Sequence, residues 1–167
     1  MADHEAIEKL ARALVEELTA AGKAVSTAES CSGGWVAKAI TDIAGSSAVF
    51  HYGIVSYSNG AKESLLGVRN ETLEEHGAVS KAVVIEMAEG VLNLSVADIA
   101  VAVSGVAGPT GGSEQKPVGT VWFAWMVRDG SKLRSTTSCE HFDGDRDLVR
   151  ELSVVHALQG VRERIVK

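Results

Sequence analysis

The sequence predicts an α/β fold, a three-layer sandwich in which a mixed sheet lies between two layers of helices. Two observations lead to this fold class. Segments with helical spacing of their apolar residues alternate with β-rich segments along the chain, and only a short turn separates the last two β-rich segments. Alternating helices and strands favour an α/β arrangement, whereas a short turn joins antiparallel strands. The sheet is therefore expected to be mixed.

The first part of the chain predicts a helix, a strand and a second helix. Apolar residues spaced three and four apart over residues 4–21 indicate an amphipathic helix that ends at Gly22. A short strand over 24–28 leads into a glycine-rich turn at 29–34, and helical spacing resumes over 35–44. A turn of this kind exposes backbone N–H groups at a helix start, where an anion or a developing oxyanion can be held.

The middle of the chain predicts a strand, three helices and a buried strand. β-Branched and aromatic residues indicate a strand over 49–58, and short helices follow over 60–67 and 70–76. Ser80 is a suitable N-cap for a longer helix with an intact apolar stripe. The nearly continuous apolar run at 99–104 is typical of a strand covered on both faces.

The last part of the chain predicts a long loop, a hairpin and a final helix. Residues 105–112 hold four glycines and a proline, so they are excluded from the interior of a helix or strand. Strands are expected over 118–127 and 133–142, joined by a hairpin turn at Asp129-Gly130. The final helix opens after residues 143–145.

Length and composition predict one folded domain, residues 1–167, complete in itself. Of the 167 residues, 46% are hydrophobic and 23% are charged, as in ordinary folded proteins. The net charge of −6 and the aromatic content of 5% disfavour DNA or RNA as a partner. No apolar run approaches the roughly 18 residues of a membrane span, and Asp3, Glu5 and Glu8 disfavour a signal peptide. We therefore expect no membrane association.

The cysteines and histidines predict neither a metal site nor a disulfide framework. Cys31 and Cys139 form no Cys-x-x-Cys pair, and the five histidines lack the spacing of metal ligands. These features fit a reducing compartment, so the protein is expected to be cytoplasmic. We expect no metal and no cofactor.

Three polar, glycine-rich corners are the candidate functional segments: residues 29–34, 104–112 and 143–146. Two of them directly follow predicted strands, and ligands of open α/β sheets collect at strand ends. Plain tight turns are the alternative interpretation of each corner taken alone. The Walker phosphate loop, the dinucleotide-binding Gly-x-Gly-x-x-Gly and the Gly-x-Ser-x-Gly elbow are all absent.

Five motifs in order along residues 5–165 identify a family resemblance. They are Ala28-Glu29-Ser30-Cys31-Ser32-Gly33-Gly34, Tyr57-Ser58-Asn59-Gly60-Ala61-Lys62, Ser104-Gly105-Val106-Ala107-Gly108-Pro109-Thr110-Gly111-Gly112, Lys116-Pro117-Val118-Gly119-Thr120-Val121 and Gly144-Asp145-Arg146. With these motifs the chain resembles the CinA carboxy-terminal domain family. The family usually has threonine where this sequence has Ser32, and the hydroxyl is kept. Stand-alone members are nicotinamide-nucleotide amidohydrolases, which convert nicotinamide mononucleotide to nicotinate mononucleotide and ammonia.

The resemblance implies a metal-free site with Ser30 as the nucleophile and Lys62 as its base. Tyr57 is expected to join the proton relay. A lysine accepts a proton only when it is neutral, and burial lowers its pKa. A helix cap at Ser30 and a solvated Lys62 are the structural alternatives. Because neighbouring residues leaving a strand point in opposite directions, we expect Ser30 in the pocket and Cys31 in the core.

The remaining candidate residues are assigned to substrate binding. Gly33 and Gly34 are expected to supply oxyanion-hole N–H groups, and Arg146 is expected to bind the phosphate. For Arg146 the alternative is an exposed residue paired with Asp143 or Asp147. The wall against the ribose and phosphate is expected to consist of Ser104, Gly105, Gly108, Gly111 and Gly112.

Other functions stay open at this point. A non-catalytic nucleotide-binding or competence- and damage-related interaction module is the alternative from a different class, and a hydrolase of another amidated nucleotide is a third reading. The partner implied by the amidohydrolase hypothesis is a small-molecule nucleotide, in the salvage of pyridine nucleotides. A homodimer is also expected.

Overall fold

The structure is a computed structural model that describes residues 3–165. Its helices and strands alternate along most of the chain. In order they are α1 (His4–Ala21), β1 (Val25–Glu29), α2 (Trp35–Thr41), the short 3₁₀ helix η1 (Ser46–Ala48), β2 (Phe50–Val55), α3 (Asn59–Leu66), α4 (Asn70–His76), α5 (Lys81–Leu94), β3 (Ile99–Gly105), β4 (Thr120–Asp129), β5 (Lys132–His141) and α6 (Arg146–Ile165).

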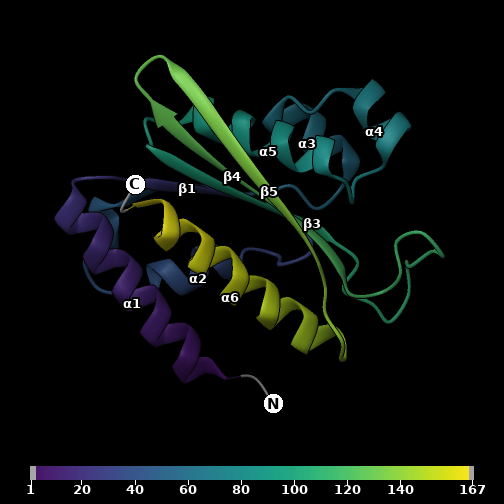
Figure 1. Cartoon of the computed structure of the whole chain (residues 1–167), viewed down its shortest axis with the longest axis horizontal. Coiled ribbons are helices and arrows are strands. Elements are labelled where there is room, and N and C mark those ends of the chain that lie inside the picture. Colours follow the sequence, from purple (N-terminus) through teal and green to yellow (C-terminus); the bar gives the residue numbers. More distant parts are fainter. Residues whose placement is uncertain (1–2, 166–167) are drawn as a thin grey trace.

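The strands form one mixed sheet in the order β2-β1-β3-β4-β5. β1 pairs in parallel with both β2 and β3. β4 and β5 then extend the sheet by antiparallel pairing, as the short turn between them requires. The carboxyl ends of β1, β2 and β3 consequently meet at one edge of the sheet (Figure 1).

Helices cover both faces of this sheet, which confirms the predicted three-layer sandwich. One face lies against α1, α2 and α6, and the other lies against α3, α4 and α5 (Figure 1). β3 shows how the two faces differ: Val101 and Val103 belong to the core under α1 and α6, whereas Ala100 and Ala102 belong to the core under α5. The alanines leave room for α5 close to the sheet.

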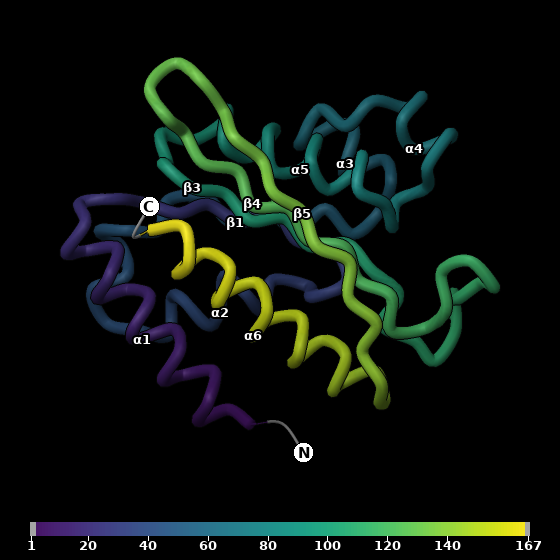
Figure 2. Tube along the Cα trace, in the orientation of Figure 1, coloured from purple at the N-terminus to yellow at the C-terminus, as the bar shows by residue number. Residues whose placement is uncertain are grey.

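The first and last helices lie side by side on the same face (Figure 2). Arg162 of α6 donates to both carboxylate oxygens of Glu17 in α1, at 3.0 and 2.6 Å. The amino-terminal end of α6 lies near the edge where the parallel strands end (Figure 2). The start of α6 therefore places the predicted corner at 143–146 close to the ends of the parallel strands.

Two predicted elements are shorter in the structure. The helix expected over 35–44 ends at Thr41, and Gly45 then takes a left-handed conformation with φ of 89° before η1 begins. The strand expected over 49–58 stops at Val55, because Ser58 serves as the N-cap of α3 and accepts a hydrogen bond from the N–H of Ala61 at 3.1 Å. α4 begins and ends where the sequence predicts.

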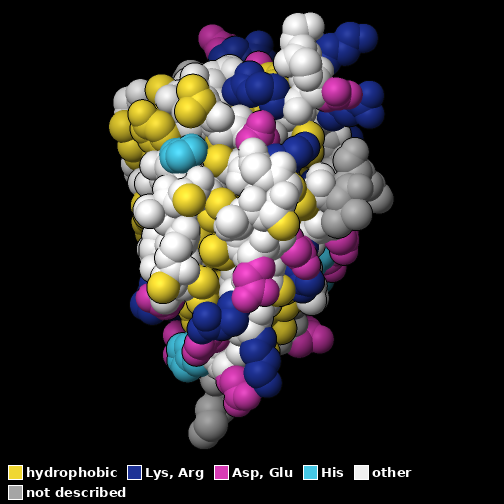
Figure 3. All heavy atoms as spheres, turned by 90° about the vertical axis from the view of Figure 1, so that its left-hand side faces the viewer, with side chains coloured by type: hydrophobic (Ala, Val, Ile, Leu, Met, Phe, Trp, Pro, Cys, Tyr) yellow, Lys and Arg dark blue, Asp and Glu magenta, His cyan; other side chains and the backbone are white. Residues whose placement is uncertain are grey.

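The surface carries charges of both signs. On the face shown in Figure 3, basic and acidic side chains are interspersed, and apolar side chains lie among them, most densely at the upper left. Across residues 3–165, no helix is both long and apolar enough to cross a lipid bilayer.

Candidate active site

The candidate corners meet at the edge where the parallel strands end. The turn at residues 30–34, called here the serine turn, follows β1, the segment 56–62 follows β2, and the loop 106–119 follows β3. The N–H of Ser30 donates to the carbonyl of Val103 at 2.9 Å, which ties the serine turn to the end of β3. Sheet topology therefore brings together segments that are far apart in sequence.

Ser30 and Lys62 are in direct contact at this edge. The Nζ of Lys62 lies 2.9 Å from the Oγ of Ser30 and donates to the carbonyl of Ser56 at 2.8 Å. Only 1% of Lys62 and 8% of Ser30 are exposed. The contact forms because Ser30 follows β1 on the side of α3, and α3 carries Lys62 one turn after its N-cap.

The burial of Lys62 changes its chemistry. Loss of hydration disfavours the ammonium form and lowers the pKa of Lys62 below that of an ordinary lysine. The structure thus excludes the solvated lysine that was the alternative interpretation. The Oγ of Ser56, also buried, has no hydrogen-bond partner among the residues that the structure describes.

Cys31 lies in the core, as expected from the alternation of side chains after a strand. It is 5% exposed and packs in the apolar cluster under α1, α2 and α6. Burial, assisted by the charge of Glu29, raises the pKa of the Cys31 thiol to about 11. A thiol with this pKa is a poor nucleophile near neutral pH.

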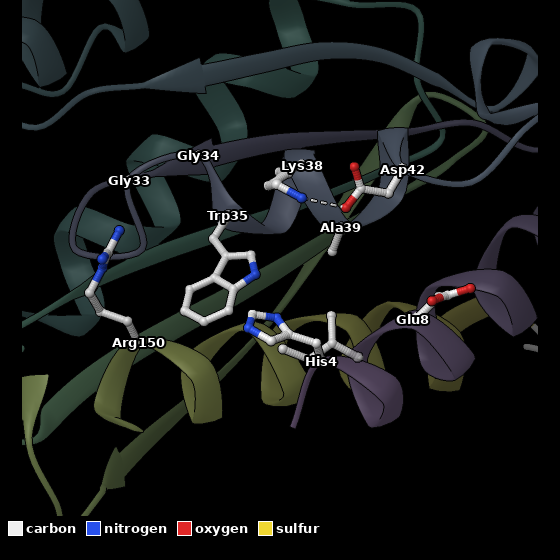
Figure 4. A pocket seen from close by; sticks show the side chains of 10 residues that line it. His4, Glu8, Gly33, Gly34, Trp35, Lys38, Ala39, Asp42 and Arg150 are labelled. Carbon is white, nitrogen blue, oxygen red and sulfur yellow. Dashed lines mark hydrogen bonds and ion pairs between the residues drawn. The ribbon is translucent and has the colours of Figure 1, made fainter. Parts of the chain in front are cut away.

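The N–H groups of Gly33 and Gly34, predicted to be oxyanion donors, have partners within or next to the serine turn. The N–H of Gly33 donates to the carbonyl of Ser30 at 3.0 Å, and the N–H of Gly34 faces the carboxylate of Glu29. Both glycines instead border a cleft of about 760 Å³ on the side of α1, α2 and α6 (Figure 4). In the described residues, no backbone carbonyl accepts from the N–H of Cys31 or Ser32.

Arg146 joins two other segments of the same edge. Its Nη1 donates to the carbonyl of Gly108 at 2.7 Å, and its Nη2 donates to the hydroxyl of Tyr57 at 2.9 Å. These contacts replace the predicted alternative of a pairing with Asp143 or Asp147. Tyr57 is 60% exposed, so its ring stands at the open side of the site.

The other predicted binding residues divide into buried and exposed positions. Ser104 is 1% exposed, and its hydroxyl donates to the carbonyl of Ala78 at 2.9 Å, which fits a structural contact. Gly105 pairs with Val121 at the end of β3. Gly111 and Gly112 are exposed in the loop that follows. Gly108 is buried, and its carbonyl accepts from Arg146. Of the five residues predicted to form the wall, Gly111 and Gly112 are therefore the two exposed to solvent.

Two residues near the site were missed by the sequence analysis. Glu29 is 1% exposed and accepts hydrogen bonds from the serine turn and from α2. Arg150 of α6 donates to the carbonyls of Cys31 and Ser32. The signal for Glu29 was its place in the first motif. No sequence pattern indicates that Arg150 contacts the serine turn, which lies more than a hundred residues earlier in the chain.

A buried lysine amine lies against a serine hydroxyl at the carboxyl edge of parallel strands. This geometry is suited to a hydrolase in which a neighbouring base activates a serine nucleophile. Within residues 3–165, no three histidine, cysteine, aspartate or glutamate side chains are grouped so as to hold a metal ion.

Comparison with known proteins places the chain in a family. The model of the CinA C-terminal domain matches residues 7–165. The nicotinamide-nucleotide amidohydrolase PncC of Escherichia coli (strain K12) is 53% identical over 167 residues, covering 100% of this chain and 99% of the relative. The protein of the same name from Pseudomonas putida is 51% identical over 155 residues, covering 93% and 94%. The chain belongs to the CinA C-terminal domain family.

A solved structure agrees with this assignment. The crystal structure of the competence damage-inducible protein A from Klebsiella pneumoniae superimposes with a TM-score of 0.90 at 42% identity. The match covers 96% of this chain and 97% of that chain. The mixed sheet with helices on both faces is therefore the fold of the family.

Proposed function

We propose that this protein is a nicotinamide-nucleotide amidohydrolase that converts nicotinamide mononucleotide and water to nicotinate mononucleotide and ammonia. Ser30 is the nucleophile and Lys62 is its base. The single observation that carries the proposal is the 2.9 Å contact between the Nζ of Lys62 and the Oγ of Ser30, made by a lysine that is only 1% exposed. The full-length similarity to proteins named for this reaction supports the choice of substrate.

The reaction begins at the Ser30 hydroxyl. Neutral Lys62 takes the hydroxyl proton while the Oγ of Ser30 attacks the carboxamide carbon, which forms a tetrahedral intermediate. Lys62 then returns the proton to the amide nitrogen, the C–N bond breaks, and ammonia leaves an ester on Ser30. Water, activated by the same amine, hydrolyses this ester to the carboxylate and restores the hydroxyl. The backbone carbonyl of Tyr57 lies 3.5 Å from the Nζ of Lys62, whereas its hydroxyl accepts from Arg146, so the phenol is assigned to the binding side of the site and not to the proton transfer.

The developing oxyanion needs hydrogen-bond donors that are fixed in advance. The N–H groups of Cys31 and Ser32 follow the nucleophile directly, and no backbone carbonyl of the described residues accepts from them. We assign them this role in place of Gly33 and Gly34. The donors and the nucleophile then belong to one short turn.

Arg146 is assigned to the phosphate of the nucleotide. Its guanidinium now donates to a neutral carbonyl and a phenol, and a phosphate dianion is a stronger acceptor than either. Gly111 and Gly112 lie exposed in the adjoining loop, which fits a wall against the ribose. The positive pyridinium of the substrate disfavours a charged lysine nearby, so the substrate itself helps to keep Lys62 neutral.

A coupled ammonia assay on a panel of substrates tests the proposal. We expect rapid release from nicotinamide mononucleotide, slow release from nicotinamide riboside, and almost none from nicotinamide or from an amidated nucleotide without a pyridinium. Chelator is expected to change none of these rates. Wild-type protein that binds the mononucleotide without releasing ammonia would instead favour the interaction module. Activity lost on metal removal and restored by zinc would contradict the metal-free mechanism.

A further inference from the structure

We propose that Glu29 and Arg150 are positioning residues that hold the serine turn from its two sides, so that Ser30 meets Lys62 and the Ser32 N–H faces the oxyanion. The inference rests on the proposed function and deepens it. Neither residue touches the reacting atoms. Glu29 contacts a side chain of the serine turn, and Arg150 contacts its backbone.

Glu29 holds the inner side of the turn. One carboxylate oxygen accepts from the hydroxyl of Ser32 at 2.7 Å and from the N–H of Val36 at 2.9 Å, and the other accepts from the N–H of Ala37 at 3.1 Å. Burial raises the pKa of Glu29, while these hydrogen bonds act in the opposite direction and favour the carboxylate. A buried carboxylate with several donors fixes them more firmly than neutral partners do.

The position of Glu29 at the end of β1 directs its carboxylate to α2. Glu29 is the last residue of the strand, and its side chain points to the face of α2, whereas Ser30 contacts α3 on the other face. The carboxylate ties the end of β1 to the first turn of α2 across residues 30–34. Any lengthening of that connection would move the Oγ of Ser30 relative to Lys62.

Arg150 holds the outer side of the turn. Its Nε donates to the carbonyl of Cys31 at 3.1 Å and its Nη2 to the carbonyl of Ser32 at 3.3 Å. In the cleft shown in Figure 4, the guanidinium lies beside the indole of Trp35, with its central carbon 5.9 Å from the ring centre. This contact on Trp35 of α2 restricts the side chain of Arg150 further.

The two carbonyl contacts set the direction of the amide between Cys31 and Ser32. In a planar trans peptide the C=O and N–H point in opposite directions. Because the carbonyl of Cys31 points to Arg150, the N–H of Ser32 points away from Arg150. Gly33 makes the approach feasible, since it has φ of 63° and an added Cβ would lie 3.0 Å from the Nη2 of Arg150.

Four variants assayed with nicotinamide mononucleotide test the proposal. Glu29→Gln places an amide NH₂ among N–H donors, and Arg150→Met keeps an unbranched apolar stem without the guanidinium and its donors. The matched controls both lie in α6, as Arg150 does. Glu151→Gln changes a buried carboxylate that accepts from the N–H of Asp3, and Arg162→Met breaks the ion pair with Glu17 of α1.

We expect kcat to fall about 10- to 100-fold in Glu29→Gln and Arg150→Met, because a small misplacement of reacting groups has effects of this size. KM should stay within about twofold, and the pH at which kcat/KM is half-maximal should not move, since Lys62 keeps its surroundings. The controls should keep kcat within about twofold. Variants that match their controls, or that raise KM with kcat unchanged, would overturn the proposal.

Further variants and the wild-type assay distinguish a failure of the positioning role from a failure to fold and from a failure of the proposed function. If Glu29→Gln does not fold, Ser32→Ala and Arg150→Lys test the proposal instead, because each removes only part of the hydrogen bonding that holds the serine turn, and kcat should fall. Ser32→Thr keeps the hydroxyl and should keep kcat. Unaltered kcat in both partial variants would overturn the proposal. A wild-type protein that releases no ammonia would overturn the proposed function itself, and this inference with it.

Discussion

The reactivity of Lys62 depends on its surroundings and not on its residue type. In water a lysine is charged and cannot accept a proton, whereas burial at the edge of the sheet lowers the pKa of the Lys62 amine. Cys31 shows the opposite effect of the same cause, because burial raises the pKa of its thiol to about 11. Of two adjacent residues with nucleophilic side chains, the hydroxyl of Ser30 contacts the amine and the thiol of Cys31 lies in the core.

The pH dependence of the reaction follows from the state of Lys62. Its amine must be neutral to act, so kcat/KM should rise with pH through the pKa of Lys62 and level off at a pH below that of an ordinary lysine titration. Initial rates of ammonia release between pH 6 and 10 measure this limb. Lys62→Gln should lower kcat/KM by several orders of magnitude, and the rise of kcat/KM with pH should disappear. A flat profile in the wild type, or the same limb in Lys62→Gln, would contradict the role of the lysine.

Residue patterns alone identified part of the site. The hydroxyls and glycines of the serine turn could be found because they are adjacent in sequence, but Ser30 and Lys62 are 32 positions apart and their contact depends on the sheet order. The pairing came from the family resemblance. The hydrogen bonds of the turn, which occupy the N–H groups of Gly33 and Gly34, have no signature in the sequence.

At the scale of elements, the position of Lys62 depends on how closely α3 lies against α5. Gly90 of α5 faces the last residue of α3: a Cβ added there would lie 2.8 Å from the carbonyl carbon of Leu66. The absence of a side chain at Gly90 therefore sets the distance between the two helices. Hydrophobic periodicity predicted both helices but not this close approach, because a glycine within a helical pattern does not by itself indicate that another segment packs against it.

Gly90→Ala should displace α3 and thereby move Lys62 away from Ser30. We expect a loss of stability of about 1–3 kcal/mol, as for other overpacked contacts, and a fall in kcat. Urea unfolding and ammonia release measure the two effects. Gly60→Ala, in α3 itself, is the matched control, since the added Cβ would have only the Oγ of Ser58 nearby, at 3.9 Å. Wild-type stability and kcat in Gly90→Ala would show that helix spacing does not position the base.

At the scale of the whole molecule, the topology of the sheet assembles the site. Three parallel strands end at one edge, and α6 brings Arg146 to that edge from the far end of the chain. The alternation of helices and strands predicted the three layers, and the Asp129-Gly130 turn predicted the antiparallel hairpin. Strand order could not be predicted, because no local pattern records which strands are neighbours. A homodimer stays a prediction, which light scattering of the protein in solution tests.

Arg146 should distinguish substrates by their phosphate. The phosphate is bound alike in the ground and transition states, so Arg146→Ala should mainly raise KM for nicotinamide mononucleotide. The mononucleotide and nicotinamide riboside should become much more alike in kcat/KM, because the group that separates them is gone. Asp147→Ala, at the next position of α6, is the control and should leave the ratio unchanged. If Arg146→Ala slows both substrates equally, its contacts with Gly108 and Tyr57 are structural.

The most direct test of the Ser30 and Lys62 mechanism is the rate of ammonia release from nicotinamide mononucleotide by Ser30→Ala beside Cys31→Ser. Ser30→Ala should lose turnover while it still binds the nucleotide and keeps the thermal stability of the wild type, because only the attacking hydroxyl is removed. Cys31→Ser should keep most of the activity, since its side chain packs in the core under α1, α2 and α6. An active Ser30→Ala together with an inactive Cys31→Ser would contradict the account and assign the nucleophile to the thiol.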